Sequence, residues 1–522
     1  MRHPNFRSFT ALCLVIALSA CGSGDDPLSD RPNIALSGTQ AIATTRLGQA
    51  IGEQSNSVVS FKGVRFALSA AGEGRWKPPT PSGAWTQPMA ATKFSDACPS
   101  GNTLEPGENE DCLFLNIYAP QSVASGSRDL PVLFWIHGGA NASGSASDYD
   151  PSLFVQQEGV VVVTTNYRVG VLGFLAHPAI DGEGHGAANY GLLDQQLALH
   201  WVKDHIRAFG GDPSNVTVFG ASSGGLNILN HMVSPSAKGL FQKAIVQSGA
   251  YQPDTPSLAA SQVRGINYAR SLGCSDSSAA SCLRTKPLTE ILARQGRTNT
   301  ASSAFNQSTV DGRVIPQTQR SAFLEGKFER VPVIQGVTRN EGRAIPSQFP
   351  EMTAANYETV AANYATTIAK ATGEMLVEYP LSHYADPFQA ASAIVGDGAF
   401  VCPSINTNRA LSAHVPVFAY EFDEASTAPF SSGHYADVEY LFTVEWAQRA
   451  TTMLGEKIRH HFTQFARTGD PNFEGIAEWK RFTATDGYMR LIAPVSQRKT
   501  DYLSEHHCAF WGSRSGIPEN SR

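Results

Sequence analysis

Apolar runs bounded by turn residues recur along the middle of the chain. In order they read LPVLFWIHGG, GVVVVTTNYR, NVTVFG, FQKAIVQSG, VPVIQGV and VPVFAYEF. Between several of them lie amphipathic or polar segments long enough for helices, such as GLLDQQLALHWVKDHIRAFG. Strands that are apolar throughout and alternate with helices predict an α/β fold, with a mostly parallel sheet covered by helices on both faces. Active residues are then expected in loops beyond the carboxyl ends of the strands.

One strand-to-helix transition carries candidate chemistry. The stretch VTVFGASSGGLN puts two serines between glycines, after a predicted buried strand and before apolar residues at helical spacing. Strand, tight turn and helix form the architecture of a nucleophile elbow, which would place Ser222 at the tip with its hydroxyl exposed. Ser222, not Ser223, is the centre of GASSG. A flexible Gly/Ser loop is the alternative interpretation of this pattern.

Length and composition predict one large domain. The 522 residues would suggest roughly three or four domains on length alone, but no Pro-rich or charged linker interrupts the chain. We therefore expect a single domain with insertions over residues 39–522. The net charge of −6 does not show the excess of positive charge that is typical of nucleic-acid-binding proteins, so no nucleic-acid partner is expected.

The N-terminus predicts export. A basic MRHPNFR precedes the apolar FTALCLVIALSA, which is typical of a signal peptide over residues 1–20. The tetrad LSAC resembles the lipobox of bacterial lipoproteins, which implies cleavage before Cys21 and acylation of its thiol. Gly22 then points, by the same resemblance, to the outer membrane, with residues 21–38 as a tether. A plain secretory signal cut after Ala20 is the alternative, in which case the protein is secreted.

An exported protein can keep disulfides. Two of the eight cysteines are accounted for, because Cys13 leaves with the signal and Cys21 would be acylated. The even set that remains favours full pairing, although six cysteines allow many connectivities. These six are Cys98, Cys112, Cys274, Cys282, Cys402 and Cys508.

Two longer segments carry a family resemblance. FGGDPSNVTVFGASSGG and EDCLFLNIYAP resemble the signature segments of type-B carboxylesterases, the cholinesterase and carboxylesterase family of α/β hydrolases. Further matches in the family's order are FKGVRFA, RWKPP, WIHGGA, NYRVGVLGFL, NYGLLDQQLALHWV, TGDPN and CAFW. They span about residues 61–511. The resemblance implies an α/β-hydrolase fold with helical insertions, and hydrolysis of carboxylic esters.

Ester cleavage by serine needs a base, a carboxylate to orient that base, and donors for the oxyanion. In this fold the chain order is Ser, then Asp or Glu, then His. Glu341 follows the apolar run VPVIQGV, and its NEG motif resembles that of the family's catalytic glutamate. Asp311 in VDGR is the alternative acid, although Asp-Gly is more simply a turn.

The base must be chosen among 14 histidines. His434 lies in a polar loop after VPVFAYEF, and GHYADVEYLF resembles the segment that carries the family's catalytic histidine. His460 and His461 are adjacent on a predicted helix and point apart, so we expect them to be packing and surface residues. His506 and His507 precede Cys508 near the end of the chain.

The oxyanion hole is expected from backbone N–H groups of HGGAN and of the residue after the nucleophile. The family pattern implies Gly139, Ala140 and Ser223. Ala140 stands where many relatives have a third glycine, so a positive φ there would carry strain. Asn141 replaces a large aromatic residue, and we expect it to change the wall of the acyl site.

The resemblance also implies supporting positions. Ser248 and Asp397 match polar residues that support the histidine in relatives. The implied disulfides join Cys98 to Cys112, Cys274 to Cys282 and Cys402 to Cys508.

Two departures from the family pattern concern the substrate. Ala221 stands where relatives commonly have glutamate, which removes negative charge near the nucleophile and predicts weaker attraction for cations. The loop between Cys98 and Cys112 is short and contains no aromatic residue, unlike the loop that contacts choline in cholinesterases. We expect small to medium, apolar, uncharged esters, cleaved without metal or organic cofactor. Alternatives are amide or carbamate hydrolysis by the same triad, or a non-catalytic cell-surface binding protein on the same fold.

Overall fold

The structure is a computed structural model that describes residues 33–185, 188–251, 254–296, 305–343, 352–424, 433–445, 447, 449–487, 489–493, 497–499 and 501–512. The predicted signal peptide over residues 1–20 and the predicted acylation site Cys21 lie outside the described residues.

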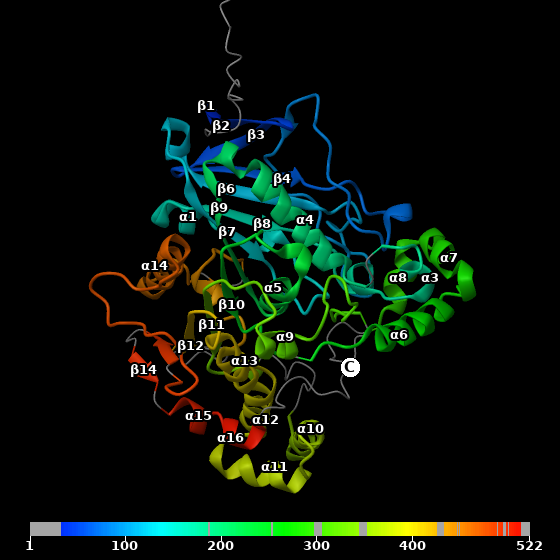
Figure 1. The fold of residues 1–522 in the computed structure, drawn as a ribbon, viewed down its shortest axis with the longest axis vertical. Helices are drawn as coiled ribbons and strands as arrows, with labels where there is room; N and C mark the ends of the chain where they lie inside the picture. Colours follow the sequence, from blue (N-terminus) through cyan, green and yellow to red (C-terminus); the bar gives the residue numbers. More distant parts are fainter. Residues whose placement is uncertain are drawn as a thin grey trace, which may run out of the picture.

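The described strands form one continuous sheet (Figure 1). Its spatial order is β1-β2-β3-β4-β6-β8-β7-β9-β10-β11-β12-β13-β14, with β5 beside β3. The strands are β1 (Ile34–Ser37), β2 (Gln40–Thr45), β3 (Gly48–Ser55), β4 (Val58–Arg65), β5 (Met89–Ala90), β6 (Phe114–Pro120), β7 (Leu130–Ile136), β8 (Val161–Thr165), β9 (Gly211–Ala221), β10 (Lys243–Gln247), β11 (Val333–Thr338), β12 (Val417–Phe422), β13 (Met489–Ile492) and β14 (Gln497–Lys499).

All strands from β8 to β13 in this order run parallel to their neighbours, and these include all six predicted apolar runs. The strands beyond them on either side pair antiparallel, except β5 with β3. The prediction of a mostly parallel sheet is confirmed. In register, Val246 of β10 lies opposite Gly220 of β9 and Gln335 of β11. The carboxyl ends of β9, β10 and β11 therefore meet at one edge.

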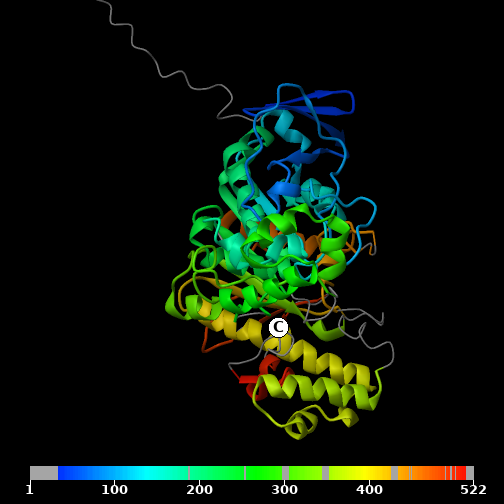
Figure 2. The same ribbon diagram turned by 90° about the vertical axis from the view of Figure 1, so that its right-hand side faces the viewer.

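Helices cover the sheet and form its insertions (Figures 1 and 2). The α-helices are α1 (Ser152–Glu158), α2 (Gly170–Phe174), α3 (Pro178–Asp181), α4 (Tyr190–His205), α5 (Ser223–Val233), α6 (Leu258–Ser271), α7 (Ala279–Thr285), α8 (Leu288–Arg294), α9 (Gln319–Glu325), α10 (Ala354–Thr367), α11 (Thr372–Glu378), α12 (Pro387–Val395), α13 (Cys402–Ser412), α14 (Met453–Thr468), α15 (Tyr502–Glu505) and α16 (Cys508–Trp511). A π-helical turn, η9 (Gly396–Val401), joins α12 to α13.

Alternate residues of the central strands enter two separate cores. On β7, Phe134 packs with residues of α4 and α5, whereas Trp135 packs with residues of α1 and α14. Both side chains are fully buried. Burying one such side chain stabilises the fold by roughly 1.5 to 3 kcal/mol relative to leaving it exposed. Burial on both faces is the reason that these strands are apolar throughout rather than alternating with polar residues.

Two helical insertions have cores of their own. Helices α6, α7 and α8 form a lobe at the right of Figure 1, around buried Tyr268 and Leu283. Helices α10, α11 and α12 form a second lobe, seen at the bottom of Figure 2, around Tyr357 and Ile394. The continuous run Pro387–Ser412 is long and apolar enough to cross a membrane, but 83% of its apolar window is buried inside the protein. This run is therefore a core helix.

The sheet begins inside the segment that the sequence predicts to be a tether. Ile34 is buried and pairs with Ala43 of β2, so β1 lies within residues 21–38. The folded part thus starts several residues before the predicted boundary at residue 39. A four-residue edge strand is too short for its pattern to be recognised in a polar stretch.

The described cysteines form three disulfides. Cys98 joins Cys112, Cys274 joins Cys282, and Cys402 joins Cys508. These are the pairs that the family resemblance implies. The last spans a sequence separation of 106 and anchors α16 to the start of α13. Closing a loop of this length contributes about 4 to 5 kcal/mol in the chain-entropy treatment.

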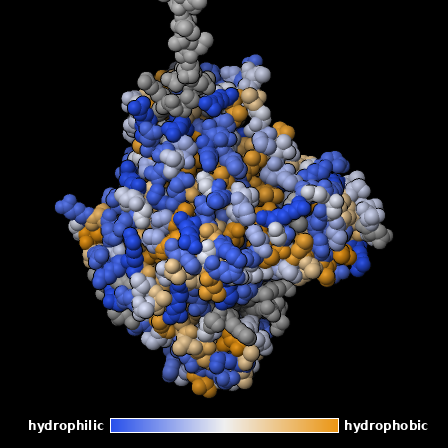
Figure 3. Space-filling model, viewed as in Figure 1, coloured by the Kyte–Doolittle hydropathy of each residue, from blue (hydrophilic) through white to orange (hydrophobic). Residues whose placement is uncertain are grey.

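The surface in view is mixed in character. In Figure 3, hydrophobic residues form small patches scattered among hydrophilic ones. This is the usual composition of a protein surface in contact with water.

Candidate active site

Ser222 occupies the turn between β9 and α5. Its backbone has φ +55° and ψ −124°, a conformation that few residues other than glycine adopt. The Ser222 N–H donates to the Gln247 carbonyl at 2.8 Å, and its own carbonyl accepts from the Leu226 N–H at 2.9 Å. The turn is therefore strained and held from both sides, as a nucleophile elbow requires.

Glycines on both sides of the Ser222 turn let the neighbouring strand β7 approach it closely. A Cβ on Gly220 would lie 2.7 Å from the Ile136 carbonyl oxygen. A Cβ on Gly224 would lie 2.0 Å from the same oxygen. The motif GASSG thus has glycine where β7 comes too close for any side chain.

Glu341 lies just after β11 and is fully buried. Its Oε1 accepts from the Ser248 hydroxyl at 2.5 Å and from the Thr338 N–H at 2.7 Å. Its Oε2 lies 2.5 Å from Nδ1 of His434. These contacts fix the carboxylate in one orientation and direct one oxygen to the imidazole.

His434 follows β12, and residues 425–432 between them lie outside the described residues. Its Nδ1 faces the Glu341 carboxylate, which can only accept, so Nδ1 carries the proton of this contact. Nε2 is then the nitrogen available as a base. The ring packs against Phe400 of η9, with 4.8 Å between the ring centroids.

Parallel strand pairing brings these loops together. Ser222, Glu341 and His434 each follow a strand of the parallel region, namely β9, β11 and β12. A further β-bridge joins Asn340 to Gly433, the residues immediately before Glu341 and His434. The chain order of the three is Ser, Glu, His, which is the order expected of an α/β hydrolase.

The loop after β7 has three consecutive residues with positive φ. The angles are +105° at Gly139, +57° at Ala140 and +54° at Asn141. The strain anticipated for Ala140 is therefore present. For residues other than glycine, backbone in this region is strained and persists only where the surroundings hold it.

Hydrogen bonds hold this loop along its length. Nδ1 of His137 contacts the Gly138 carbonyl at 2.8 Å, and burial lowers the pKa of His137 to about 4. The neutral imidazole can therefore donate from Nδ1. The Gly139 carbonyl accepts from the N–H groups of Ala142 and Ser143, at 2.9 and 3.0 Å. The loop is preorganised before any substrate binds, which is the property that an oxyanion hole needs.

Comparison with known proteins decides the family. A sequence model described as the Carboxylesterase family matches residues 39–511. The chain belongs to the carboxylesterase family. It is therefore a carboxylic ester hydrolase, and the prediction of this family from its motifs is confirmed.

Relatives and solved structures agree with this assignment. The chain is 34% identical to the para-nitrobenzyl esterase of Bacillus subtilis over 466 residues, covering 84% of this chain and 92% of the relative. It is 32% identical to the human cocaine esterase, covering 97% and 95%. The structure of a PNB esterase superposes with a TM-score of 0.77 at 31% identity, covering 90% of this carboxylesterase and 99% of the other chain. The α/β-hydrolase fold is thereby confirmed.

Asn141 has a partner that the motif does not show. It is completely buried, and its side-chain amide exchanges hydrogen bonds with that of Asn227 on α5, at 2.8 and 3.3 Å. The side chain turns inward and braces the loop after β7 (residues 137–143, here called the oxyanion loop) against α5, and its effect on the wall of the acyl site stays a prediction. An amide can do this where an aromatic side chain cannot.

Asp397 also has different partners from those expected. Its carboxylate accepts from Tyr379 at 2.9 Å and contacts Nδ1 of His506 at 2.6 Å, so it does not support His434 directly. Nε2 of His506 contacts Glu421 of β12 at 2.8 Å. Burial alone would lower the pKa of His506, but the two carboxylates raise it to about 10. The result is a buried imidazolium between the two acids, one of which belongs to β12.

Asp437 is a buried acid that the sequence reasoning missed. It accepts a hydrogen bond from Tyr420 at 2.6 Å, and it lies three residues after His434. Burial raises the pKa of Asp437, and the charge of Glu341 raises it further, while Tyr420 and His434 oppose the shift. In the sequence it is one of two acidic residues in GHYADVEYLF, the other being Glu439, and the pattern alone does not distinguish them.

The alternative candidates have structural roles. Asp311 accepts from Asn189 and from the backbone N–H groups of Arg313 and Ile315, each at 2.9 Å, so it organises a turn. His461 is buried and contacts the Pro471 carbonyl at 2.9 Å, whereas His460 is exposed beside Glu158.

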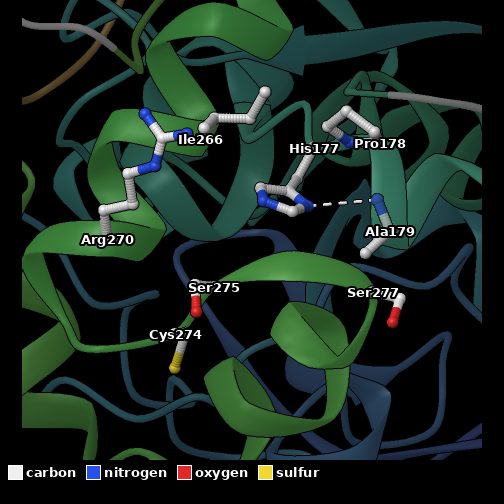
Figure 4. Close-up of a pocket in the computed structure, with 8 residues that line it drawn as sticks. All are labelled: His177, Pro178, Ala179, Ile266, Arg270, Cys274, Ser275 and Ser277. Carbon is white, nitrogen blue, oxygen red and sulfur yellow. Dashed lines mark hydrogen bonds between the residues drawn. The ribbon is translucent and has the colours of Figure 1, made fainter.

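Among the described residues, no group of three His, Cys, Asp or Glu side chains could hold a metal ion. A surface pocket of about 400 Å³ lies between α3 and α6, and Ser222, Glu341 and His434 are not among its lining residues (Figure 4). It is lined by His177, Pro178, Ala179, Ile266, Arg270, Cys274, Ser275 and Ser277.

Proposed function

We propose that this carboxylesterase cleaves esters through Ser222, His434 and Glu341, by way of an acyl-enzyme. The observation that carries the proposal is the contact of 2.5 Å between Glu341 Oε2 and His434 Nδ1, in segments that follow β11 and β12 of the same parallel region as the serine's strand β9. A buried carboxylate in this place sets the tautomer of the imidazole and stabilises the imidazolium that forms.

The reaction follows from these groups. Ser222 Oγ attacks the ester carbonyl carbon while His434 Nε2 takes the hydroxyl proton. The negative oxygen of the tetrahedral intermediate is stabilised by the N–H groups of Gly139, Ala140 and Ser223. His434 then gives its proton to the leaving alkoxide as the C–O bond breaks. Water repeats the sequence on the acyl-enzyme and releases the acid.

Small to medium uncharged esters are the proposed substrates. Ala221 precedes the nucleophile and is buried at 1% exposure, so a cationic alcohol group finds no carboxylate at this position. The Cys98–Cys112 loop contains no aromatic residue to receive such a cation. Both features favour neutral substrates over choline esters.

Export and lipid anchoring belong to the proposal as well. Three disulfides among the described residues support an oxidising compartment. We expect Cys21 to be acylated and the protein to be anchored in the outer membrane. Intact-mass analysis of the protein extracted from membranes should show the added acyl mass, and an unmodified Cys21 would contradict the anchor.

Hydrolysis of p-nitrophenyl esters from acetate to long acyl chains tests the reaction. We expect turnover by the wild type and a loss of about 10⁴-fold or more in Ser222→Ala. Ser223→Ala is the matched variant and should lose at most a few-fold, because alanine keeps the backbone N–H. Equal turnover in wild type and Ser222→Ala would refute the nucleophile. Faster cleavage of an isosteric amide than of the ester would refute the substrate class.

A further inference from the structure

Tyr435 directly follows His434 and reaches the oxyanion loop. Its hydroxyl oxygen accepts a hydrogen bond from the Gly138 N–H at 2.9 Å, across 297 positions of sequence. The same hydroxyl lies 2.8 Å from that of Tyr149. One residue thus joins the segment that carries the base to the segment that carries the oxyanion donors.

The backbone of Tyr435 is held in an unfavourable conformation to make this contact. Its φ is +81°, which a bulky aromatic residue rarely adopts. Such a conformation costs on the order of 1 to 3 kcal/mol and persists only where the surroundings enforce it. The contact with Gly138 is therefore a feature that the fold maintains against local strain.

Gly138 lies where three segments meet: its own loop after β7, the segment of Tyr435, and the end of β9 at Ala221. A Cβ there would lie 2.5 Å from the Tyr435 hydroxyl and 2.7 Å from the carbonyl oxygen of Ala221, the residue before the nucleophile. The Gly138 carbonyl is held in turn by Nδ1 of His137. Hydrogen bonds thus hold both the N–H and the carbonyl of Gly138. They thereby fix the orientation of the peptide groups that follow, which carry the N–H groups of Gly139 and Ala140.

We propose that Tyr435 is a positioning residue that couples the His434 loop to the oxyanion loop through Gly138. This inference rests on the triad and oxyanion hole proposed above. The donors stabilise charge that develops only in the transition state. Loss of the coupling should therefore lower kcat and leave KM nearly unchanged, whereas a general loss of structure lowers the fraction of folded protein.

Tyr435→Phe tests the proposal, with Tyr149→Phe as its matched control. Phenylalanine keeps the ring at either position. Tyr435→Phe removes the acceptor of the Gly138 N–H, whereas Tyr149→Phe removes a hydroxyl from the same pair and leaves that acceptor in place. Both variants are assayed for kcat and KM on p-nitrophenyl butyrate, for inhibition by an aryl trifluoromethyl ketone, and for thermal unfolding. The ketone reacts with the serine to form an oxyanion and reports on the oxyanion hole.

We expect Tyr435→Phe to lower kcat and the affinity for the ketone by about 10-fold each, since a buried N–H is left without an acceptor. KM should stay within twofold, and Tyr149→Phe should stay within twofold of the wild type in all three values. Wild-type kcat and ketone affinity in a folded Tyr435→Phe would overturn the proposal, as would equal losses in the two variants.

Two further variants keep the outcomes separable. Tyr435→Gly relieves the positive φ and also lacks the hydroxyl, so the proposal predicts the same direction of loss in kcat. A kcat at or above that of the wild type would show that only backbone strain matters and would overturn the coupling. Ser222→Ala in the same assay isolates the triad: if it stays active, the proposed triad has failed, and if it is inactive while Tyr435→Phe is fully active, only the coupling has failed.

Discussion

The buried His506 gives the sharpest prediction on stability. Its ring lies between Asp397 and Glu421, and all three residues are at most 5% exposed. Replacing His506 by glutamine removes the positive charge and leaves two carboxylates buried together. Removal of one partner from a buried charge pair typically destabilises a protein by about 3 to 5 kcal/mol.

The pKa of His506 gives a second estimate. Its value of about 10 in the folded protein, against 6.5 for an ordinary histidine, corresponds to about 5 kcal/mol. Because the folded pKa is the higher one, this stabilisation is complete below pH 6.5 and is lost as the pH rises through 10. The two estimates agree in size, and the second adds a pH window.

Thermal unfolding measures both the size of this destabilisation and its dependence on pH. A folded chain of this length changes its unfolding free energy by about 1 kcal/mol per degree near Tm, so His506→Gln should lower Tm by about 3 to 5 °C at pH 7. The difference from the wild type should shrink as the pH approaches 10. His507→Asn is the matched control, because His507 pairs with Glu378 near the surface and such a pair contributes at most about 1 kcal/mol. A Tm within 1 °C of the wild type at pH 7, or a difference that stays constant from pH 6 to pH 10, would show that the charge of His506 does not stabilise the fold.

Three further predictions concern turnover of p-nitrophenyl acetate and related esters. Glu341→Gln should lower kcat by about 10³- to 10⁴-fold, because a neutral amide neither sets the tautomer of His434 nor stabilises its charged form; near-normal turnover would mean that another acid is the partner. Ser248→Ala removes one of the two hydrogen bonds to Glu341 Oε1 and should lower kcat/KM by about 10-fold with Tm nearly unchanged; wild-type kcat/KM would show that the Thr338 N–H suffices. Ala221→Glu places a carboxylate beside the nucleophile and should improve KM for butyrylcholine relative to the neutral 3,3-dimethylbutyl butyrate, and an unchanged ratio of the two KM values would contradict the charge argument.

Much of the architecture was predictable because it depends on local pattern. Strands buried on both faces must be apolar throughout, so runs such as VPVIQGV and VPVFAYEF could be assigned as β11 and β12. Ser222 could be selected over Ser223 because the tight turn between strand and helix needs glycine on both sides at fixed spacing. Motifs of the family then located Glu341 and His434, which lie 93 positions apart.

The remaining features depend on contacts between distant segments. Nothing in the sequence around Asn141 shows that Asn227 lies opposite it, so its inward orientation could not be predicted. The partnership of Asp397 with His506 joins residues 109 positions apart, in the same two segments that the Cys402–Cys508 disulfide links. Tyr435 carries a positive φ that no propensity predicts for tyrosine, and only its distant partner Gly138 explains it.

Covalent labelling would show whether Ser222 is the nucleophile. The wild-type protein would be treated with a fluorophosphonate, digested and analysed by peptide mass spectrometry. We expect a single phosphonylated residue, Ser222, with no labelling of the Ser222→Ala variant and greatly slowed labelling of His434→Ala. A label on Ser223 or on any other residue, or equal labelling of Ser222→Ala, would contradict this assignment.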